Sequence, residues 1–173
     1  MHFALQVGSV RQAEATRRGC RNRIPIINSA GEWSVHISGA LGEMAAVKAL
    51  GTFWPASVNA AKSEPDLPPD IQVRTRPKSH HDLIIRPDDP DHHRYILVTG
   101  SGPVFSVIGW IKGADGKRDR WFRDRGDYGA PCYWIPQHSL VQIHPPEIPP
   151  ENILPNKHVS DGFDGIRPNR IPF

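Results

Sequence analysis

The stretch EPDLPPDIQVRTR, residues 64–76, decides what fold we expect. Its second half, residues 71–76, alternates between apolar and polar side chains, which predicts a strand with Gln72 and Arg74 on the same face. Its first half holds three prolines and two aspartates, Asp66 and Asp70, which is typical of a turn. A polar turn that leads into a strand is therefore the element around which the rest of the domain is arranged.

Two helices are expected before this strand. Residues 38–50 (SGALGEMAAVKAL) have apolar side chains at helical spacing, with Ser38 as a candidate N-cap and Gly51 as the C-terminal cap. Residues 10–22 predict a second helix, which is rich in arginine. Glu43 then falls in the first turns of its helix, where the helix dipole favours a carboxylate. A structural role is therefore open to Glu43 beside a functional one.

Further strands follow residues 71–76. Runs rich in Ile and Val predict strands over 83–86, 95–99 and 104–111, and shorter signals indicate strands over 57–60 and 133–136 and a helical turn over 139–143. Residues 112–130 form a charged excursion. Residues 145–173 hold seven prolines in 29 positions, which excludes a regular helix or a central strand. We expect a single α/β domain over 1–144 and an extended arm over 145–173, which could dock on a protein partner or a second copy.

The composition fits one globular domain. The chain has 173 residues, of which 38% are hydrophobic and 23% charged, with a net charge of +3. No apolar run approaches the roughly 20 residues of a spanning helix, and the N-terminus lacks a secretory pattern. Two cysteines cannot form a disulfide framework or a four-cysteine zinc site. A cytoplasmic protein without a membrane partner is the expectation.

Oxygen-bearing side chains surround the predicted strand. The carboxylates of Glu43 and Asp66 and the amide oxygen of Gln72 are ligands that suit Mg²⁺, with Mn²⁺ as an alternative. Arg74 lies two residues after Gln72, so its charge would fall beside the metal and could stabilise a phosphodiester under attack. Asp70 is a rival to Asp66 for the role of metal ligand, because both lie in the same turn.

The order of these motifs along the chain resembles that of a known family. The order GALGEMAAVKAL, then Pro65–Asp66, then QVRTR is similar to the PD-(D/E)XK nuclease superfamily, and the GWI and WIP segments are similar to small phage-type members. The resemblance covers roughly residues 38–143. It implies a restriction-endonuclease-like fold, a mixed central sheet flanked by helices, that cuts nucleic acid with Mg²⁺. It also implies that Glu43, Asp66 and Gln72 hold the metal and that Arg74 takes the place of the catalytic lysine.

The chain departs from the family pattern at two positions. Gln72 stands where Asp or Glu is usual, and Arg74 stands where Lys is usual. An arginine keeps its proton at any working pH, so it can stabilise negative charge but cannot act as a general base. The main hypothesis is a metal-dependent nuclease acting on DNA rather than RNA. The alternative is a catalytically inactive nucleic-acid-binding or assembly module on the same fold.

Basic and aromatic residues suggest how nucleic acid would be held. Arginine suits bidentate contact with phosphate, and an exposed aromatic ring suits stacking on unpaired bases. Trp121, flanked by arginines, is the better stacking candidate, whereas core packing suits Trp110 and Trp134. The basic clusters are also compatible with an ordinary solvated surface. The candidate contact residues are Arg11, Arg17, Arg18, Arg76, Lys117, Arg118, Arg120, Trp121 and Arg123.

Overall fold

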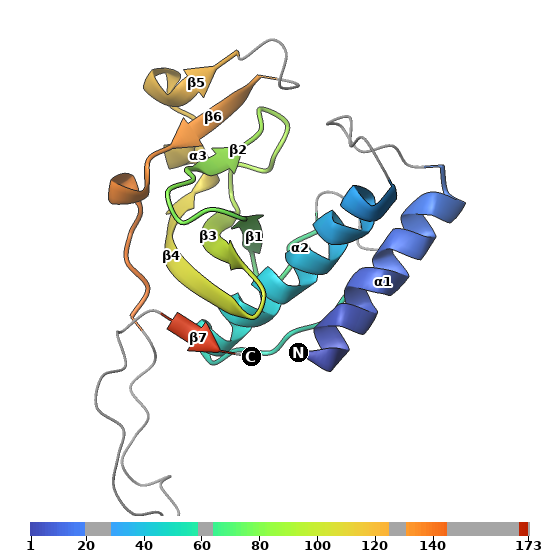
Figure 1. Ribbon diagram of the computed structural model, residues 1–173. Helices are drawn as coiled ribbons and strands as arrows, with labels where there is room; N and C mark the ends of the chain where they lie inside the picture. The colour runs from blue at the N-terminus through green and yellow to red at the C-terminus, as the bar shows by residue number, and fades with distance from the viewer. Residues whose placement is uncertain (20–28, 59–63, 125–130, 145–169, 173) are drawn as a thin grey trace, which may run out of the picture.

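The computed structural model describes residues 1–19, 29–58, 64–124, 131–144 and 170–172, which form a mixed α/β fold (Figure 1). The helices are α1 (His2–Arg17), α2 (Ser29–Leu50) and α3 (Gly113–Gly116). The strands are β1 (Ile71–Arg76), β2 (Leu83–Ile85), β3 (Arg94–Ser101), β4 (Val104–Lys112), β5 (Phe122–Arg123), β6 (Cys132–Ile135) and β7 (Arg170–Pro172). Single turns of 3-10 helix lie at Asp119–Trp121 and Gln137–Ser139.

The larger sheet has the strand order β1-β3-β4-β7. Strand β1 runs parallel to β3, and the other pairs are antiparallel. Between β1 and β3 the chain crosses to a second sheet, of order β2-β6-β5. In the register of the larger sheet, Gln72 lies opposite Tyr95 and Arg74 opposite Leu97. Within the described part of the chain, β1 is an edge strand, so its outer edge is open to the turn that precedes it.

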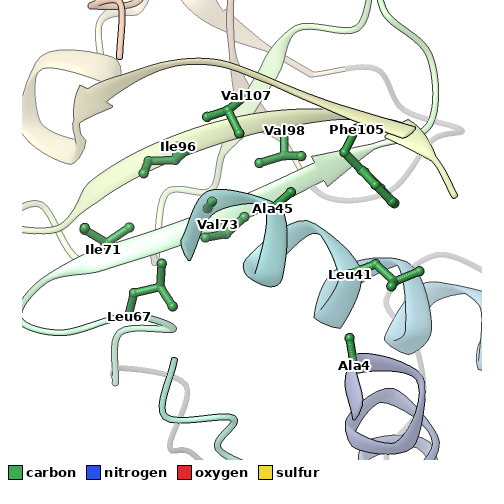
Figure 2. Packing of buried hydrophobic residues seen from close by; sticks show 11 residues of the cluster. Ala4, Leu41, Ala45, Leu67, Ile71, Val73, Ile96, Val98, Phe105 and Val107 are labelled. Atoms are coloured by element: carbon green, nitrogen blue, oxygen red, sulfur yellow. The ribbon is translucent and has the colours of Figure 1, made fainter. Parts of the chain in front are cut away.

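The larger sheet separates two hydrophobic cores. On one face, Leu41 and Ala45 of α2 pack against Val73, Ile96 and Val98, as Figure 2 shows, and α1 lies outside α2. On the other face, Tyr95 and Leu97 belong to a second cluster with residues of β2 and β6. Paired residues of neighbouring strands share a face. Gln72 and Arg74 therefore point toward the second sheet, whereas Val73 points toward α2.

The first helix is not where the sequence predicts it. It begins at His2 and ends at Arg17, instead of covering 10–22, and residues 20–22 lie outside the described residues. Small residues form its contact face: Ala4 is buried, and a Cβ at Gly8 would lie 2.6 Å from the Cα of Ile37 in α2. The backbones of α1 and α2 approach closely there. A stripe of small residues has no strong hydrophobic periodicity, which is why the pattern was missed.

The second helix begins at Ser29 rather than at Ser38. Ser38 is therefore an interior residue, and its prediction as the N-cap is wrong. Glu43 lies fourteen residues after the first residue of α2, so attraction to the helix N-terminus does not explain it. The predicted end is confirmed, because Gly51 follows Leu50 with φ of 61°, the left-handed conformation of a C-terminal glycine cap.

The strand predictions are mostly confirmed. Strand β1 has the predicted bounds, and β2, β3, β4 and β6 lie within one or two residues of theirs. Residues 57–58 are not in a strand, and residues 59–60 lie outside the described residues. The turn expected over 139–143 is a 3-10 helix at Gln137–Ser139, after which Val141 forms a bridge with Trp110. Of the predicted arm, only 170–172 is described, as an edge strand on β4.

Candidate functional site

Asp66 lies at the open edge of β1. Two backbone hydrogen bonds between Leu67 and Ile71, of 3.0 and 2.9 Å, close the turn that folds back along the strand. Oδ2 of Asp66 accepts a hydrogen bond from the Val73 N–H at 2.8 Å. On an edge strand such an N–H has no strand partner on its outer side. The carboxylate of Asp66 takes the place of that partner.

Glu43 reaches the same edge from α2. The helix approaches β1 so closely that a Cβ at Gly42 would lie 1.8 Å from Oγ1 of Thr75. Glu43 follows this contact directly, and its side chain is buried, with 5% of the residue exposed. The close approach therefore brings the carboxylate of Glu43 to the level of β1.

A cation and an indole hold the Glu43 carboxylate. Arg11 of α1 donates from both terminal nitrogens, at 2.5 Å to Oε1 and 2.9 Å to Oε2. The indole N–H of Trp54 also donates to Oε2, at 2.9 Å. The Nε of Arg11 donates to the carbonyl of Ser57 at 2.8 Å. Glu43 thus links α1, α2 and the segment after α2.

The two carboxylates influence each other. Burial, and then the negative charge of Glu43, raise the pKa of Asp66 to about 6 from an ordinary value of 3.8. The hydrogen bond from Val73 and the charges of Arg74 and Arg11 act in the opposite direction, but they do not outweigh the first two causes. A carboxylate pair with a raised pKa in a partly buried setting is a common feature of functional sites.

Gln72 and Arg74 complete the group from β1. The amide Nε2 of Gln72 donates to the carbonyl of Glu64 at 2.6 Å, and its Oε1 lies 3.4 Å from Nη1 of Arg74. Nη2 of Arg74 donates to Oδ2 of Asp89 at 2.9 Å. The guanidinium also lies over the ring of Tyr95, 5.3 Å from the ring centroid. Asp89 and Tyr95 are both buried, so Arg74 is held from two sides.

The structure separates the two rival aspartates. Asp70 accepts three hydrogen bonds from the guanidinium of Arg94, between 2.5 and 3.2 Å. Asp66 interacts electrostatically with Glu43. Asp66 lies within electrostatic range of both Glu43 and Arg74, and Arg74 contacts Gln72, but Glu43 lies on the α2 face of the sheet whereas Gln72 and Arg74 lie on the other face.

Sequence reasoning missed the residues that support the site. Asp89, in the loop before β3, accepts hydrogen bonds from both the guanidinium of Arg74 and the N–H of Arg86. Lys117 fixes that loop by donating to the carbonyls of Pro87 and Asp89. No local pattern marks Asp89 for this role, because its partner lies fifteen residues away on another element. Trp54 is the one supporting residue that the sequence could have indicated, because an indole that packs in a fold needs an acceptor for its N–H.

The predicted nucleic-acid contacts fall in several places. Arg11 and Lys117 are mostly buried and form ion pairs, with Glu43 and Asp91 respectively. Arg17 and Arg18 lie at the end of α1, where Arg17 forms an ion pair with Glu14 at 2.6 Å. The others lie on β1 or near the second sheet: Arg76 over Trp134, Arg118 beside Asp115, Arg120 over Trp121, and the exposed Arg123.

Trp121 differs from its predicted role. We expected an exposed ring that stacks on bases, but the residue is only 8% exposed and belongs to the second core. Arg120 covers it, 4.3 Å from the ring centroid. Its chemistry is that of a core residue, because the segment 119–121 folds onto the second sheet. Trp110, expected in the core, is by contrast only half-buried.

The donor set is compatible with a hard cation. Within the described ranges, no group of three or more His, Cys, Asp or Glu side chains is arranged to hold a metal. Magnesium, however, usually takes only one or two protein carboxylates and keeps several waters. Glu43 and Asp66 provide two carboxylates that repel each other, whereas the amide oxygen of Gln72 lies beside Arg74 on the other face of β1. A divalent cation beside Glu43 and Asp66 would reduce the repulsion that, after burial, raises the pKa of Asp66.

The comparisons with known proteins add no relative. No family model, no curated protein and no solved structure matches the chain. In the part of the chain that the structure describes, none of the helices combines the length and apolar character needed to cross a bilayer.

Proposed function

We propose that the chain is a metal-dependent nuclease with a restriction-endonuclease-like fold, and that it hydrolyses phosphodiester bonds of DNA. The observation that supports this proposal is the position of Asp66 at the open edge of β1, within electrostatic range of Glu43 on one side and of Arg74, which contacts Gln72, on the other. These residues are up to 31 positions apart in the sequence, and a solvated surface would have no reason to gather them. The mixed sheet with α2 packed on one face is compatible with that fold.

The residues of the proposed site have different roles. Glu43, Asp66 and Gln72 would hold Mg²⁺. When bound, the metal would supply an activated water and neutralise charge on the phosphate. At neutral pH, Asp66 is mostly ionised, because the pH lies above its raised pKa of about 6. Arg74 stays protonated and donates hydrogen bonds to the phosphate oxygens, where negative charge grows during the reaction.

One observation favours the second candidate, a binding module without catalysis. Both oxygens of Glu43 already bind the guanidinium of Arg11. If this ion pair stays closed, the internal cation replaces a metal and the site is only structural. In that case the basic residues would still bind nucleic acid in a salt-dependent manner.

A cleavage assay separates the two candidates. Linear duplex DNA, circular single-stranded DNA and RNA are incubated with the protein in Mg²⁺, Mn²⁺ or EDTA. Glu43→Gln and Asp66→Asn are compared with Glu14→Gln, which removes an acid that pairs with Arg17 on the exposed side of α1. We expect cleavage that needs metal and falls roughly 100-fold or more in both site variants, but not in the control.

Two results would count against the nuclease. Cleavage that persists in both site variants would place the active residues elsewhere. No cleavage of any substrate by well-folded protein would favour the binding module instead, and a salt titration of DNA binding would then test that candidate.

A further inference from the structure

A hollow of about 320 Å³ lies beside Asp70, in the turn that also carries Asp66. Its walls include Trp110 and Ile111 of β4 and the bridging residue Val141, and its rim includes Arg94, Lys112 and Asp70. Small-molecule sites have volumes of about 300–1,000 Å³. The hollow is therefore large enough for one small ligand and too small for a folded segment.

The walls of the hollow are fixed in place. Trp110 and Val141 exchange two backbone hydrogen bonds, of 2.9 and 2.8 Å. A Cβ at Gly109 would lie 2.6 Å from the carbonyl oxygen of Val141, so the two segments are in close contact. Arg94 is held by Asp70 and lies 5.9 Å from the centre of the Trp110 ring. The aromatic wall is thus ordered before any ligand arrives, which reduces the cost of binding.

The charges around the hollow favour an anion. Asp70 neutralises Arg94, and Asp115, which also lines the hollow, lies 3.4 Å from Arg118, which does not. Lys112 is exposed, and it has no acidic partner among the residues that the structure describes. His92 also lines the hollow and is exposed. An apolar aromatic wall beside an uncompensated cation is suited to a ring that carries a phosphate.

The hollow lies near the candidate site. Asp66 and Asp70 are four residues apart, so their Cα atoms are within about 14 Å. The backbone of Asp70 accepts the N–H of Arg94 at 2.9 Å, which joins the turn to the rim of the hollow. A nucleic-acid strand whose phosphate lies at Asp66 could reach the hollow with a neighbouring nucleotide.

We propose that the hollow binds one nucleotide of the substrate strand, with its base against Trp110 and its phosphate at Lys112. The inference rests on the proposed function for the class of ligand, and it adds a subsite to it. Stacking on an aromatic ring holds a base without selecting its identity. The hollow would thus set the position of the strand rather than read its sequence.

The test uses the whole chain in EDTA, so that it does not depend on cleavage. The five tryptophans give five indole N–H signals in an NMR spectrum of ¹⁵N-labelled protein, and Trp110→Phe identifies the one from Trp110. Deoxyadenosine 5′-monophosphate is titrated, with deoxyribose 5-phosphate and deoxyadenosine as partial ligands. We expect the nucleotide to shift the Trp110 signal with a Kd of roughly 1 mM and both partial ligands to bind more weakly.

Two lysine variants provide the matched comparison. Lys112→Ala should weaken nucleotide binding by about fivefold or more. Lys78→Ala, which removes an exposed lysine from the loop before β2, should leave binding unchanged. A Trp110 signal that does not move, a sugar phosphate that binds as well as the nucleotide, or equal effects of the two variants would each overturn the inference. Nucleotide binding without cleavage of any substrate would support the hollow while the nuclease proposal fails.

Discussion

The guanidinium of Arg74 and the carboxylate of Asp89 lie 2.9 Å apart and join β1 to the loop before β3. Asp89 is nearly buried, and its Oδ2 also accepts the N–H of Arg86 at 2.8 Å. Tyr95 lies beneath the guanidinium. Arg74 is therefore held in one orientation by groups that do not belong to the proposed metal site.

We expect Asp89→Asn to lower the free energy of unfolding by about 2 kcal/mol, because a partly buried guanidinium loses its charged partner. Urea unfolding of Asp89→Asn, Arg74→Gln and the double variant gives the coupling energy of the pair. Asp91→Asn is the control, since Asp91 lies in the same loop but is largely exposed. A coupling energy near zero would mean that the contact contributes nothing to stability.

Gly42→Ala tests how closely α2 lies on β1. A methyl group at position 42 would lie 1.8 Å from Oγ1 of Thr75, so the helix must move away from the strand. We expect a loss of about 2–3 kcal/mol of stability and a loss of activity, because Glu43 moves with the helix. Gly39→Ala is the matched control: nothing lies within 4 Å of its Cβ, and alanine should stabilise the helix by about 0.5–1 kcal/mol. Thermal unfolding of both variants measures these stability changes. Equal changes in Gly42→Ala and Gly39→Ala would contradict the close contact between α2 and β1.

Asp66→Asn should change how stability depends on pH in metal-free protein. In the folded protein the pKa of Asp66 is about 6, above its ordinary value of 3.8, so ionisation of the carboxyl opposes folding. That cost is absent below about pH 4, grows between pH 4 and 6, and is constant above. Asparagine stays neutral and can still accept the Val73 N–H. We expect the variant to gain roughly 1–2 kcal/mol over the wild type at pH 8 and nothing at pH 3.5.

Urea unfolding of both proteins over this pH range provides the measurement for Asp66. All of it is done in EDTA, so that Glu43, Arg11 and Arg74 are the charged neighbours. A stability difference that stays constant from pH 3.5 to 8 would show that the burial of Asp66 does not penalise its ionised form.

Gln72→Glu tests the proposed metal site through its charge. A carboxylate at position 72 would add a negative charge to the proposed site, beside the guanidinium of Arg74, and should raise the affinity for Mn²⁺ by roughly tenfold. Calorimetric titration with Mn²⁺ measures the affinity. Gln137→Glu, a change of the same kind on the loop that binds Ser79 and His81, is the control. If both variants bind Mn²⁺ as the wild type does, no cation lies at Gln72.

The bounds of β1 and the face shared by Gln72 and Arg74 could be predicted from the sequence, because both depend on a local pattern. Alternation over 71–76 determines β1 and puts Gln72 and Arg74 on one face. The turn with two aspartates had to lie next to that strand. The parallel pairing of β1 with β3 has no such signal, because it depends on where the chain returns after the second sheet.

The partners of the site could not be predicted because they depend on tertiary contacts. Arg11 reaches Glu43 only when α1 lies against α2, and that contact is made by small residues such as Gly8. Asp89 reaches Arg74 only after the chain has passed through β2. In both cases a charged residue looked like a surface residue in the sequence and became an internal counter-ion in the fold.

The contact between Gly42 and Thr75 has a consequence for how this chain can change in evolution. A hydrogen at position 42 and a hydroxyl at position 75 fill the same gap, so neither position can gain volume alone. Homologous sequences, when compared, should show the two positions varying together. An alanine at 42 should accompany glycine or alanine at 75, and threonine at 75 should always accompany glycine at 42.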